Sequence, residues 1–269
     1  MSKHTRQWNQ QKYENYLREG RGQGEGMDYK PWVRIQDFAS KGTVSRVYSP
    51  KTGRVHHLLS NNEKYYFYLL EWSDQVLDIR EQFPLADIQT AMAIADSAGI
   101  KYPTDNVSGF PYVLSCDFFI TTRNGMKART IKQSSELNRT RVVEKLEIER
   151  RYWKRQNIDW KLVTENEIRQ PLAKNLEWLH SAYVYEDIPT CLRNELFARL
   201  KEQYDGTELP VVTITDAADY TYGFAHGTCL SLFKYLVWTK YISFDLSHEL
   251  NFGMKRIKAR ANKEKPVLC

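Results

Sequence analysis

A short hairpin signal places the strongest constraint on how this chain can fold. Residues 115–134 read SCDFFITTRNGMKARTIKQS, in which two apolar-rich runs flank Asn124 and Gly125. That dipeptide is typical of the turns that join two antiparallel strands. Asp117 lies inside the first run and Lys132 ends the second, although buried strands rarely hold such charges. The hairpin therefore predicts that an acid and a lysine meet at one end of a strand pair.

The pattern around this hairpin predicts a mixed α/β domain in which helices flank a mixed sheet. A helix is expected after Ser60, because Ser60 followed by Glu63 is a capping-box pattern before an apolar run. The segment 87–100 allows a helix, and 101–111 contains Pro and Gly residues that predict a loop. The other elements expected are strands near 76–84, 112–121, 126–132 and 160–165 and helices over 60–72 and 134–157.

The pattern changes after residue 168, so we expect a first domain over residues 1–168 and a second over 169–269. Several helices are followed by the alternating segment YISFDLS, which predicts a short strand at 241–247. Helices followed by a strand fit a winged-helix-like module that binds DNA or a partner protein. The chain closes with a basic tail, and the helices are expected at about 170–182, 187–204 and 227–239.

The composition limits the partners and the compartment. The 269 residues have a formal net charge of +6 and interleave aromatic with basic residues, which is compatible with a nucleic-acid partner. The four cysteines form no C-x-x-C pair, which argues against a zinc site and a disulfide framework. No stretch approaches the roughly 18 apolar residues that a membrane span needs. We expect a soluble cytoplasmic protein with reduced thiols.

Glu63, Asp117 and Lys132 are together the right residue types for a nuclease site. Mg²⁺ prefers oxygen ligands, usually one or two carboxylates with waters and phosphate oxygens. Metal-dependent nucleases place an acid on one strand and an acid-x-lysine triplet on the next, but here Thr130 stands at the acid position. Ile131 can add its main-chain carbonyl as a ligand. From spacing alone, each residue taken singly favours another interpretation: a helix cap for Glu63, a strand-end turn for Asp117 and a solvated charge for Lys132.

Longer blocks of sequence surround these residues. GRGQGEGMDYKPW, YSPKTGRVHHLLSNNE, EWSDQVLDIREQFPL, SCDFF and EKLEIERRYWKRQNIDW follow one another within residues 15–180. In this order they resemble the TnsA family, the endonuclease subunits of the heteromeric transposases of Tn7-type transposons. Beyond residue 180 the likeness is weak, and only the family's architecture is the guide there.

The resemblance implies a restriction-endonuclease-like first domain and a winged-helix-like second domain. It implies that Glu63, Asp117 and Lys132 are the active-site residues. Glu63, Asp117 and the Ile131 carbonyl would hold one or two Mg²⁺ ions, for which Mn²⁺ is expected to substitute. The family's triplet often has glutamine where this chain has Thr130, whose hydroxyl is a poorer metal ligand that a bridging water can replace.

The resemblance also implies a reaction and its partners. The expected reaction is hydrolysis of phosphodiesters at the 5′ ends of a transposon in double-stranded DNA. A TnsB-like transposase is expected to cut and join the 3′ ends, and a TnsC-like ATPase regulator to bind the C-terminal part. Lys132 would position or deprotonate the attacking water, or stabilise the phosphorane.

Two other functions stay open at this point. One is a free-standing restriction or repair nuclease of the same fold, which would cleave DNA without a partner. The other is a catalytically inert DNA-binding scaffold. Thr130 supports the scaffold, because loss of a ligand is how such sites decay, whereas the joint presence of Glu63, Asp117 and Lys132 argues against it.

Several further residues are candidates for contacts around the site. Glu81 and Gln82 lie near the expected site and are considered as supporting groups. The spaced glycines of GRGQGEG lack G-K-[ST], so they indicate a flexible or DNA-facing loop and not a nucleotide site. A phosphate-binding track for DNA and a solvated helix face with ion pairs are equal alternatives for four cations, Arg150, Arg151, Lys154 and Arg155.

Overall fold

The chain divides into two units, Met1–Arg169 and Gln170–Cys269, next to the boundary predicted at residue 168. The computed structural model describes residues 7–37, 43–182, 190–248 and 250. The basic tail lies outside the described residues.

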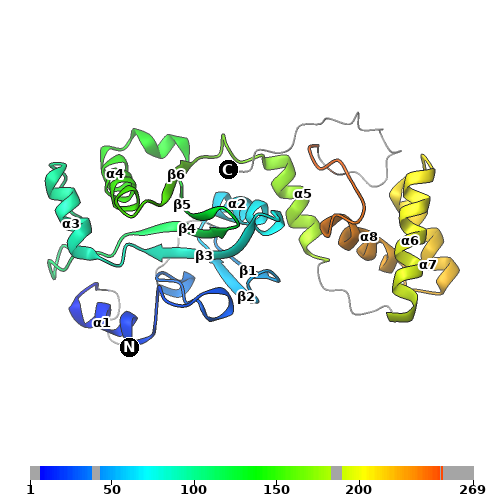
Figure 1. The fold of residues 1–269 in the computed structure, drawn as a ribbon, viewed down its shortest axis with the longest axis horizontal. Helices are drawn as coiled ribbons and strands as arrows, with labels where there is room; N and C mark the ends of the chain where they lie inside the picture. The colour runs from blue at the N-terminus through cyan, green and yellow to red at the C-terminus, as the bar shows by residue number, and fades with distance from the viewer. Residues whose placement is uncertain (1–6, 38–42, 183–189, 249, 251–269) are drawn as a thin grey trace. The chain divides into compact units, whose positions relative to one another are not determined.

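A four-stranded sheet forms the centre of the N-terminal unit (Figure 1), with its strands in the order β3-β4-β5-β6. The first two pairs are antiparallel and the pair β5–β6 is parallel, which confirms the predicted mixed sheet. The strands are β3 (Val76–Pro84), β4 (Ser115–Thr122), β5 (Gly125–Ile131) and β6 (Asp159–Val163).

The predicted hairpin joins β4 to β5. Thr122 pairs with Gly125, whose φ of +111° is rarely adopted by residues with a side chain. Phe118 pairs with Arg129 further along, and this register places Asp117 opposite Thr130. The start of β4 therefore lies beside the end of β5, as the spacing of the two charged residues predicts.

Helices cover both faces of this sheet. Phe118 of β4 contacts Tyr66 of α2 with ring centroids 5.8 Å apart, whereas the neighbouring Phe119 contacts Trp153 of α4 at 5.3 Å. Neighbouring strand residues point to opposite faces, so α2 and α4 lie on opposite sides. The helices around the sheet are α2 (Asn61–Trp72) on one face and α3 (Ile88–Ser97) and α4 (Thr140–Arg155) on the other, and the 3₁₀ turn η4 (Ser134–Asn138) precedes α4.

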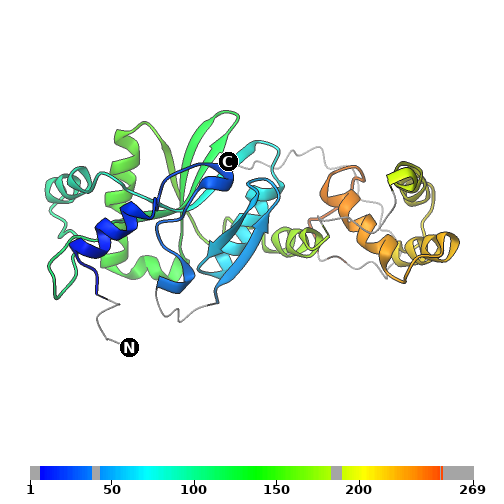
Figure 2. The same cartoon turned by 90° about the horizontal axis from the view of Figure 1, so that it is seen from below.

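A second, two-stranded sheet was not predicted from the sequence. It pairs β1 (Ser45–Ser49) with β2 (Arg54–Leu58) and lies beside α2 in both views (Figures 1 and 2). Glu81 of β3 connects it to the main sheet: its fully buried carboxylate accepts hydrogen bonds from the Arg54 guanidinium at 2.8 and 2.5 Å and from the His57 main chain at 3.1 Å. Burial opposes ionisation, but His56 and Arg54 hold the pKa of Glu81 well below its usual range.

The N-terminal segment packs onto the end of β3. It contains α1 (Gln10–Arg18) and the 3₁₀ turns η2 (Gly26–Asp28) and η3 (Ile35–Asp37), none of which was predicted. A Cβ on Gly22 would approach Pro84 to 2.4 Å. The glycine run was predicted to be flexible or to face DNA, but at Gly22 the absence of a side chain permits close packing against the strand.

The C-terminal unit is helical, as expected. Its helices are α5 (Gln170–His180), α6 (Thr190–Gly206), α7 (Val211–Tyr222) and α8 (Thr228–Trp238). Three of the four were predicted, and α7 was missed. The first residues of the helix predicted over 187–204 lie outside the described part of the chain. None of the helices in the described ranges combines the length and hydropathy that a membrane span requires.

The strand predicted at 241–247 is wrong, because the described backbone there forms no strand. The alternation is nevertheless real, since Ile242 and Leu246 are buried between exposed neighbours. The Ile242 main chain donates to Leu236 O at 3.0 Å, and Asn175 of α5 donates to Leu246 O at 2.9 Å. An extended segment that packs over helices therefore alternates buried and exposed residues like a strand, although its main chain bonds to the helices and not to a neighbouring strand.

Candidate active site

Asp117 is held at the start of β4 by groups from both neighbouring strands. Its Oδ2 accepts the main-chain N–H of Ile131 at 2.6 Å, and its Oδ1 accepts the side-chain amide of Gln82 at 3.1 Å. The side chain is almost fully buried. A buried carboxylate with directed donors on both oxygens has a defined orientation, as a ligand or catalytic group requires.

Lys132 contacts the same carboxylate. Its Nζ lies 3.3 Å from Oδ2 of Asp117 and donates to the main-chain oxygen of Ile131 at 2.9 Å. Burial opposes the charged form, but the carboxylates of Asp117, Glu149 and Glu63 outweigh it and raise the pKa of Lys132. The ammonium group therefore lies between two oxygens that the sequence predicts as metal ligands.

Glu63 reaches this cluster from the first turn of α2. Ser60 caps the helix by accepting the Glu63 N–H at 3.1 Å and donates its own hydroxyl to Oε1 of Glu63 at 2.9 Å. The Leu59 N–H donates to Oε2 at 2.9 Å. Burial, followed by repulsion from Asp117, raises the pKa of Glu63 to about 8. Glu63 is thus both the predicted cap partner and a close neighbour of Asp117.

Glu149 is a fourth acidic residue of the cluster, and the sequence did not predict it. It projects from α4, is buried, and accepts the Thr130 hydroxyl at 2.5 Å. Trp160 in turn donates its indole N–H to the Thr130 oxygen at 3.2 Å. The Thr130 hydroxyl is therefore already hydrogen-bonded to two side chains. Through it, the carboxylate of Glu149 on α4 lies next to the strand position that has no acid of its own.

The environment of Glu149 shows that it belongs to the same electrostatic cluster. Burial raises the pKa of Glu149 to about 7. The negative charge of Asp117 also raises this pKa, whereas the Thr130 hydrogen bond and the positive charge of Lys132 lower it. One sequence signal could have found it. Glu149 is a charged residue in the apolar stripe of α4, three residues after Leu146 and three before Tyr152, and both neighbours are buried.

The residues present fit a hard divalent cation. Within the described ranges no three His, Cys, Asp or Glu side chains form a metal-binding group by themselves. Asp117 and Glu63 together with the Ile131 carbonyl supply oxygen only, which matches an ion that completes its shell with waters and phosphate oxygens. The Lys132 ammonium next to these oxygens shows that a cation is electrostatically favoured there.

Comparison with known proteins identifies relatives over most of the chain. The family described as TnsA-like endonuclease N terminal matches residues 73–165, and that described as TnsA endonuclease C terminal matches residues 167–246. The transposon Tn7 transposition protein TnsA of Escherichia coli is 40% identical over 238 residues, which cover 86% of this chain and 84% of that protein.

The chain belongs to the TnsA endonuclease family. The two matched regions meet close to the division between the two units. Asp117, Lys132 and Glu149 lie inside the N-terminal match, and Glu63 precedes it. The α/β unit and the helical unit thus each correspond to one half of a TnsA protein.

The predicted DNA-binding track lies on the exposed side of α4, away from the buried face that holds Glu149. Arg150 and Arg151 both donate to Glu147, at 2.7 and 2.6 Å. These pairs fit the solvated-face alternative for the two arginines. Contact of Arg150, Arg151, Lys154 and Arg155 with DNA stays a prediction for this TnsA-family chain.

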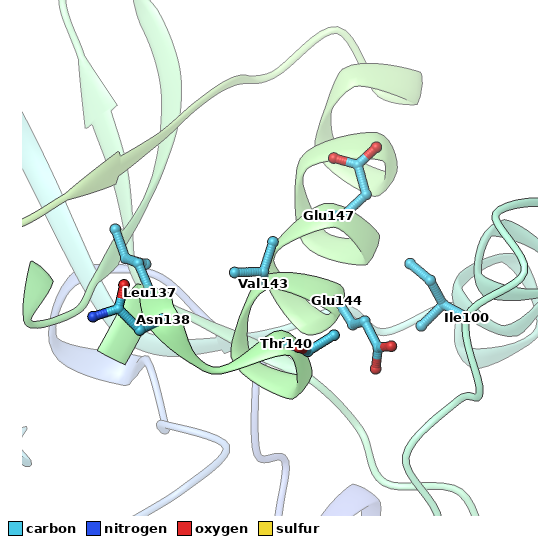
Figure 3. Close-up of a pocket in the computed structure, with 7 residues that line it drawn as sticks. All are labelled: Ile100, Leu137, Asn138, Thr140, Val143, Glu144 and Glu147. Carbon is cyan, nitrogen blue, oxygen red and sulfur yellow. The ribbon is translucent and has the colours of Figure 1, made fainter. Parts of the chain in front are cut away.

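An open pocket of about 400 Å³ lies beside the first turns of α4 (Figure 3). Ile100, Leu137 and Val143 are among its lining residues, with Glu144 and Glu147 from the helix. It contains none of the acidic residues that gather around Asp117. The candidate catalytic cluster of this TnsA-family member is therefore separate from that pocket.

Proposed function

We propose that this chain is the Mg²⁺-dependent DNA endonuclease subunit of a cut-and-paste transposase and that it hydrolyses phosphodiesters at the 5′ ends of the transposon. One observation supports this most: Lys132 contacts both the Asp117 carboxylate and the Ile131 carbonyl, and the charge of Asp117 raises the pKa of Glu63. Membership of the TnsA family supports a role for that cluster in transposition.

Asp117, Glu63 and the Ile131 carbonyl are the groups that would hold Mg²⁺. A bound Mg²⁺ supplies Lewis-acid polarisation of the scissile phosphate and lowers the pKa of a bound water. Gln82 and the Ile131 N–H fix the Asp117 carboxylate, and Ser60 and Leu59 fix that of Glu63. These contacts orient the two acids before DNA arrives, so little reorganisation accompanies the reaction.

Lys132 is best suited to stabilise developing negative charge. Its raised pKa keeps the ammonium protonated at neutral pH, which disfavours a role as a base. Among the roles left open by the sequence, neutralising the phosphorane or orienting the attacking water agrees better with this charge. Glu149, with a pKa of about 7, is a buried group that can hold or release a proton near neutral pH.

The partners follow from the same assignment. The substrate is double-stranded DNA at the transposon ends, where a TnsB-like transposase processes the 3′ ends. The helical C-terminal unit is the proposed contact region for a TnsC-like ATPase regulator. The related TnsA of Tn7 is named as a transposition protein, which supports this setting.

The decisive variant is Asp117→Ala. We expect it to fold, because the main-chain pairing of β4 with β3 and β5 remains, and to lose nicking at the 5′ ends by at least about 10²-fold. Cuts are mapped strand by strand on transposon-end DNA with Mg²⁺ and the TnsB-like partner. Asp96→Ala, which removes an exposed acid of α3, is the matched control and should cleave normally.

The same assay separates the competing functions. Intact 5′ cleavage by Asp117→Ala contradicts the site assignment. Cleavage by the wild-type chain without its partner supports a free-standing restriction or repair nuclease. No cleavage under any condition, with normal DNA binding, supports the inert scaffold.

A further inference from the structure

Gln82 lies opposite Asp117 on the neighbouring strand. Glu81 pairs with Phe118 and Phe83 with Cys116, and this register places the residue between them on β3 across from the residue between them on β4.

The backbone of Gln82 is strained at this point. Its φ is +49°, in the left-handed region, which is unfavourable for a residue with a side chain. The Trp32 N–H donates to the main-chain oxygen of Gln82 at 3.2 Å and holds this conformation from the N-terminal segment. Glycine would adopt the same backbone without that cost, so the glutamine side chain needs a role of its own.

The side-chain amide is buried and bonded at both ends. Its Nε2 donates to Oδ1 of Asp117 at 3.1 Å, and its Oε1 accepts the Ser115 hydroxyl at 3.2 Å. An ionised carboxylate can only accept hydrogen bonds, so the NH₂ end of the amide must face Asp117. The contacts thus determine which way the amide points.

The two oxygens of Asp117 have different partners. Oδ2 accepts the Ile131 N–H at 2.6 Å and lies 3.3 Å from the Lys132 ammonium. Oδ1 is held by Gln82. Without the Gln82 amide, only Oδ2 of Asp117 would be held. The carboxylate plane could then turn about the Cβ–Cγ bond, and the lone pairs left for a cation would have no fixed direction.

We propose that Gln82 is a positioning residue of the nuclease site, which fixes the carboxylate plane of Asp117 for cation binding and thereby sets the Mg²⁺ requirement of cleavage. This inference rests on the proposed function, in which Asp117 is a metal ligand. Groups that orient a ligand in this way typically change metal affinity or activity by about 10–100-fold when they are removed.

Two variants of the full chain test the proposal. Gln82→Met keeps the length of the side chain and removes the donor. Gln82→Gly removes the side chain with its two hydrogen bonds but also relieves the backbone strain, so its melting temperature should stay close to that of the wild type. Gln75→Met, at an exposed glutamine just before β3, is the matched control.

The dissociation constant for Mg²⁺ is measured by titration calorimetry without DNA. The Mg²⁺ concentration for half-maximal 5′ nicking is measured with the partner present. We expect both quantities to rise about 10-fold or more in Gln82→Met and Gln82→Gly, with a smaller change in the rate at saturating Mg²⁺. Gln75→Met should match the wild type.

The outcomes distinguish this inference from the function on which it rests. Wild-type Mg²⁺ affinity in a folded Gln82→Gly protein overturns the positioning role while the nuclease assignment stands. A wild-type chain that neither binds Mg²⁺ nor cleaves overturns both. A weakened affinity in the glycine variant, despite a melting temperature close to that of the wild type, supports positioning over a purely structural role.

Discussion

Thr130 occupies the position at which the general nuclease motif has an acid, and its contacts explain how the site is arranged without one. The hydroxyl donates to Glu149 and accepts from Trp160, so it connects β5 and β6 to a carboxylate of α4. The site thereby gains its additional acid from a helix. The threonine acts through that acid, and the proposed metal ligands remain Glu63, Asp117 and the Ile131 carbonyl.

Replacing Thr130 by valine tests this arrangement at nearly constant volume. Thr130→Val removes the hydroxyl that Glu149 and the Trp160 N–H both contact and leaves these two groups only each other, so we expect a loss of about 1 kcal/mol in the free energy of unfolding. Because the lost hydrogen bond lowers the pKa of Glu149, that pKa should rise and 5′ nicking should fall.

Thr130→Ser retains the hydroxyl and is the control for this substitution. Denaturant unfolding and strand-specific nicking are measured for both variants. If valine cleaved as well as serine, Glu149 would have no part in the reaction through this contact.

The N-terminus of α2 combines two tasks in one element. Ser60 satisfies a free N–H of the helix and at the same time donates to Glu63, whose carboxylate faces the cluster. The capping residue Ser60 and the proposed ligand Glu63 are therefore hydrogen-bonded to each other, and the start of the helix determines where one acid of the site lies.

Ser60→Ala should affect both tasks. We expect about 1 kcal/mol of lost stability from the missing cap. The hydroxyl also lowers the pKa of Glu63, so its removal should raise that pKa and shift Mg²⁺ binding towards higher pH.

Asp87→Ala removes the side chain that caps α3 by accepting the Thr90 N–H at 2.9 Å, and it provides a matched comparison. It should lose similar stability in thermal unfolding without any change in the pH dependence of Mg²⁺ titrations. Equal Mg²⁺ behaviour in Ser60→Ala and Asp87→Ala would mean that Ser60 only caps its helix.

The N-terminal unit as a whole buries several acids around one cation, and its stability should reflect that. Glu63 and Glu149 have folded-state pKa values of about 8 and 7, above their ordinary value of 4.5. For a carboxyl with a raised pKa, the stabilising contribution is complete below the unfolded pKa and is lost as the pH rises through the folded one.

The metal-free protein should therefore lose stability as the pH rises from about 4.5 to about 8, by at most about 1.4 kcal/mol per pH unit for each carboxyl that stays protonated only in the folded state, and the loss should level off above pH 8. Thermal unfolding across this range measures the effect, and Glu63→Gln should flatten the curve. Mg²⁺ should raise the melting temperature more at pH 8.5 than at pH 7. A melting temperature that is independent of pH in the wild type would contradict the burial of these acids.

Local pattern was sufficient for the elements whose signals lie close together in the chain. The hairpin follows from its turn, the start of α2 from Ser60 and Glu63, and most helices from their apolar stripes. The β1–β2 sheet and α7 escaped prediction because polar residues occupy part of their buried faces, so that hydropathy there does not follow burial: Arg54 and His56 are buried in β2, and Thr215 and Asp219 in α7. The segment 241–247 misled because burial against helices gives the same alternation as pairing in a sheet.

The sequence by itself determined the strand pair that brings Asp117 to Lys132 and the family resemblance that predicts an active-site role for these residues. Only the tertiary structure added Glu149 to them and showed that Gln82, a candidate supporting group, contacts Asp117. The reason is physical: a hairpin and a helix cap are made by residues a few positions apart, so their chemistry is visible locally. Glu149 and Gln82 reach the site through packing and register between distant elements, which no local spacing encodes.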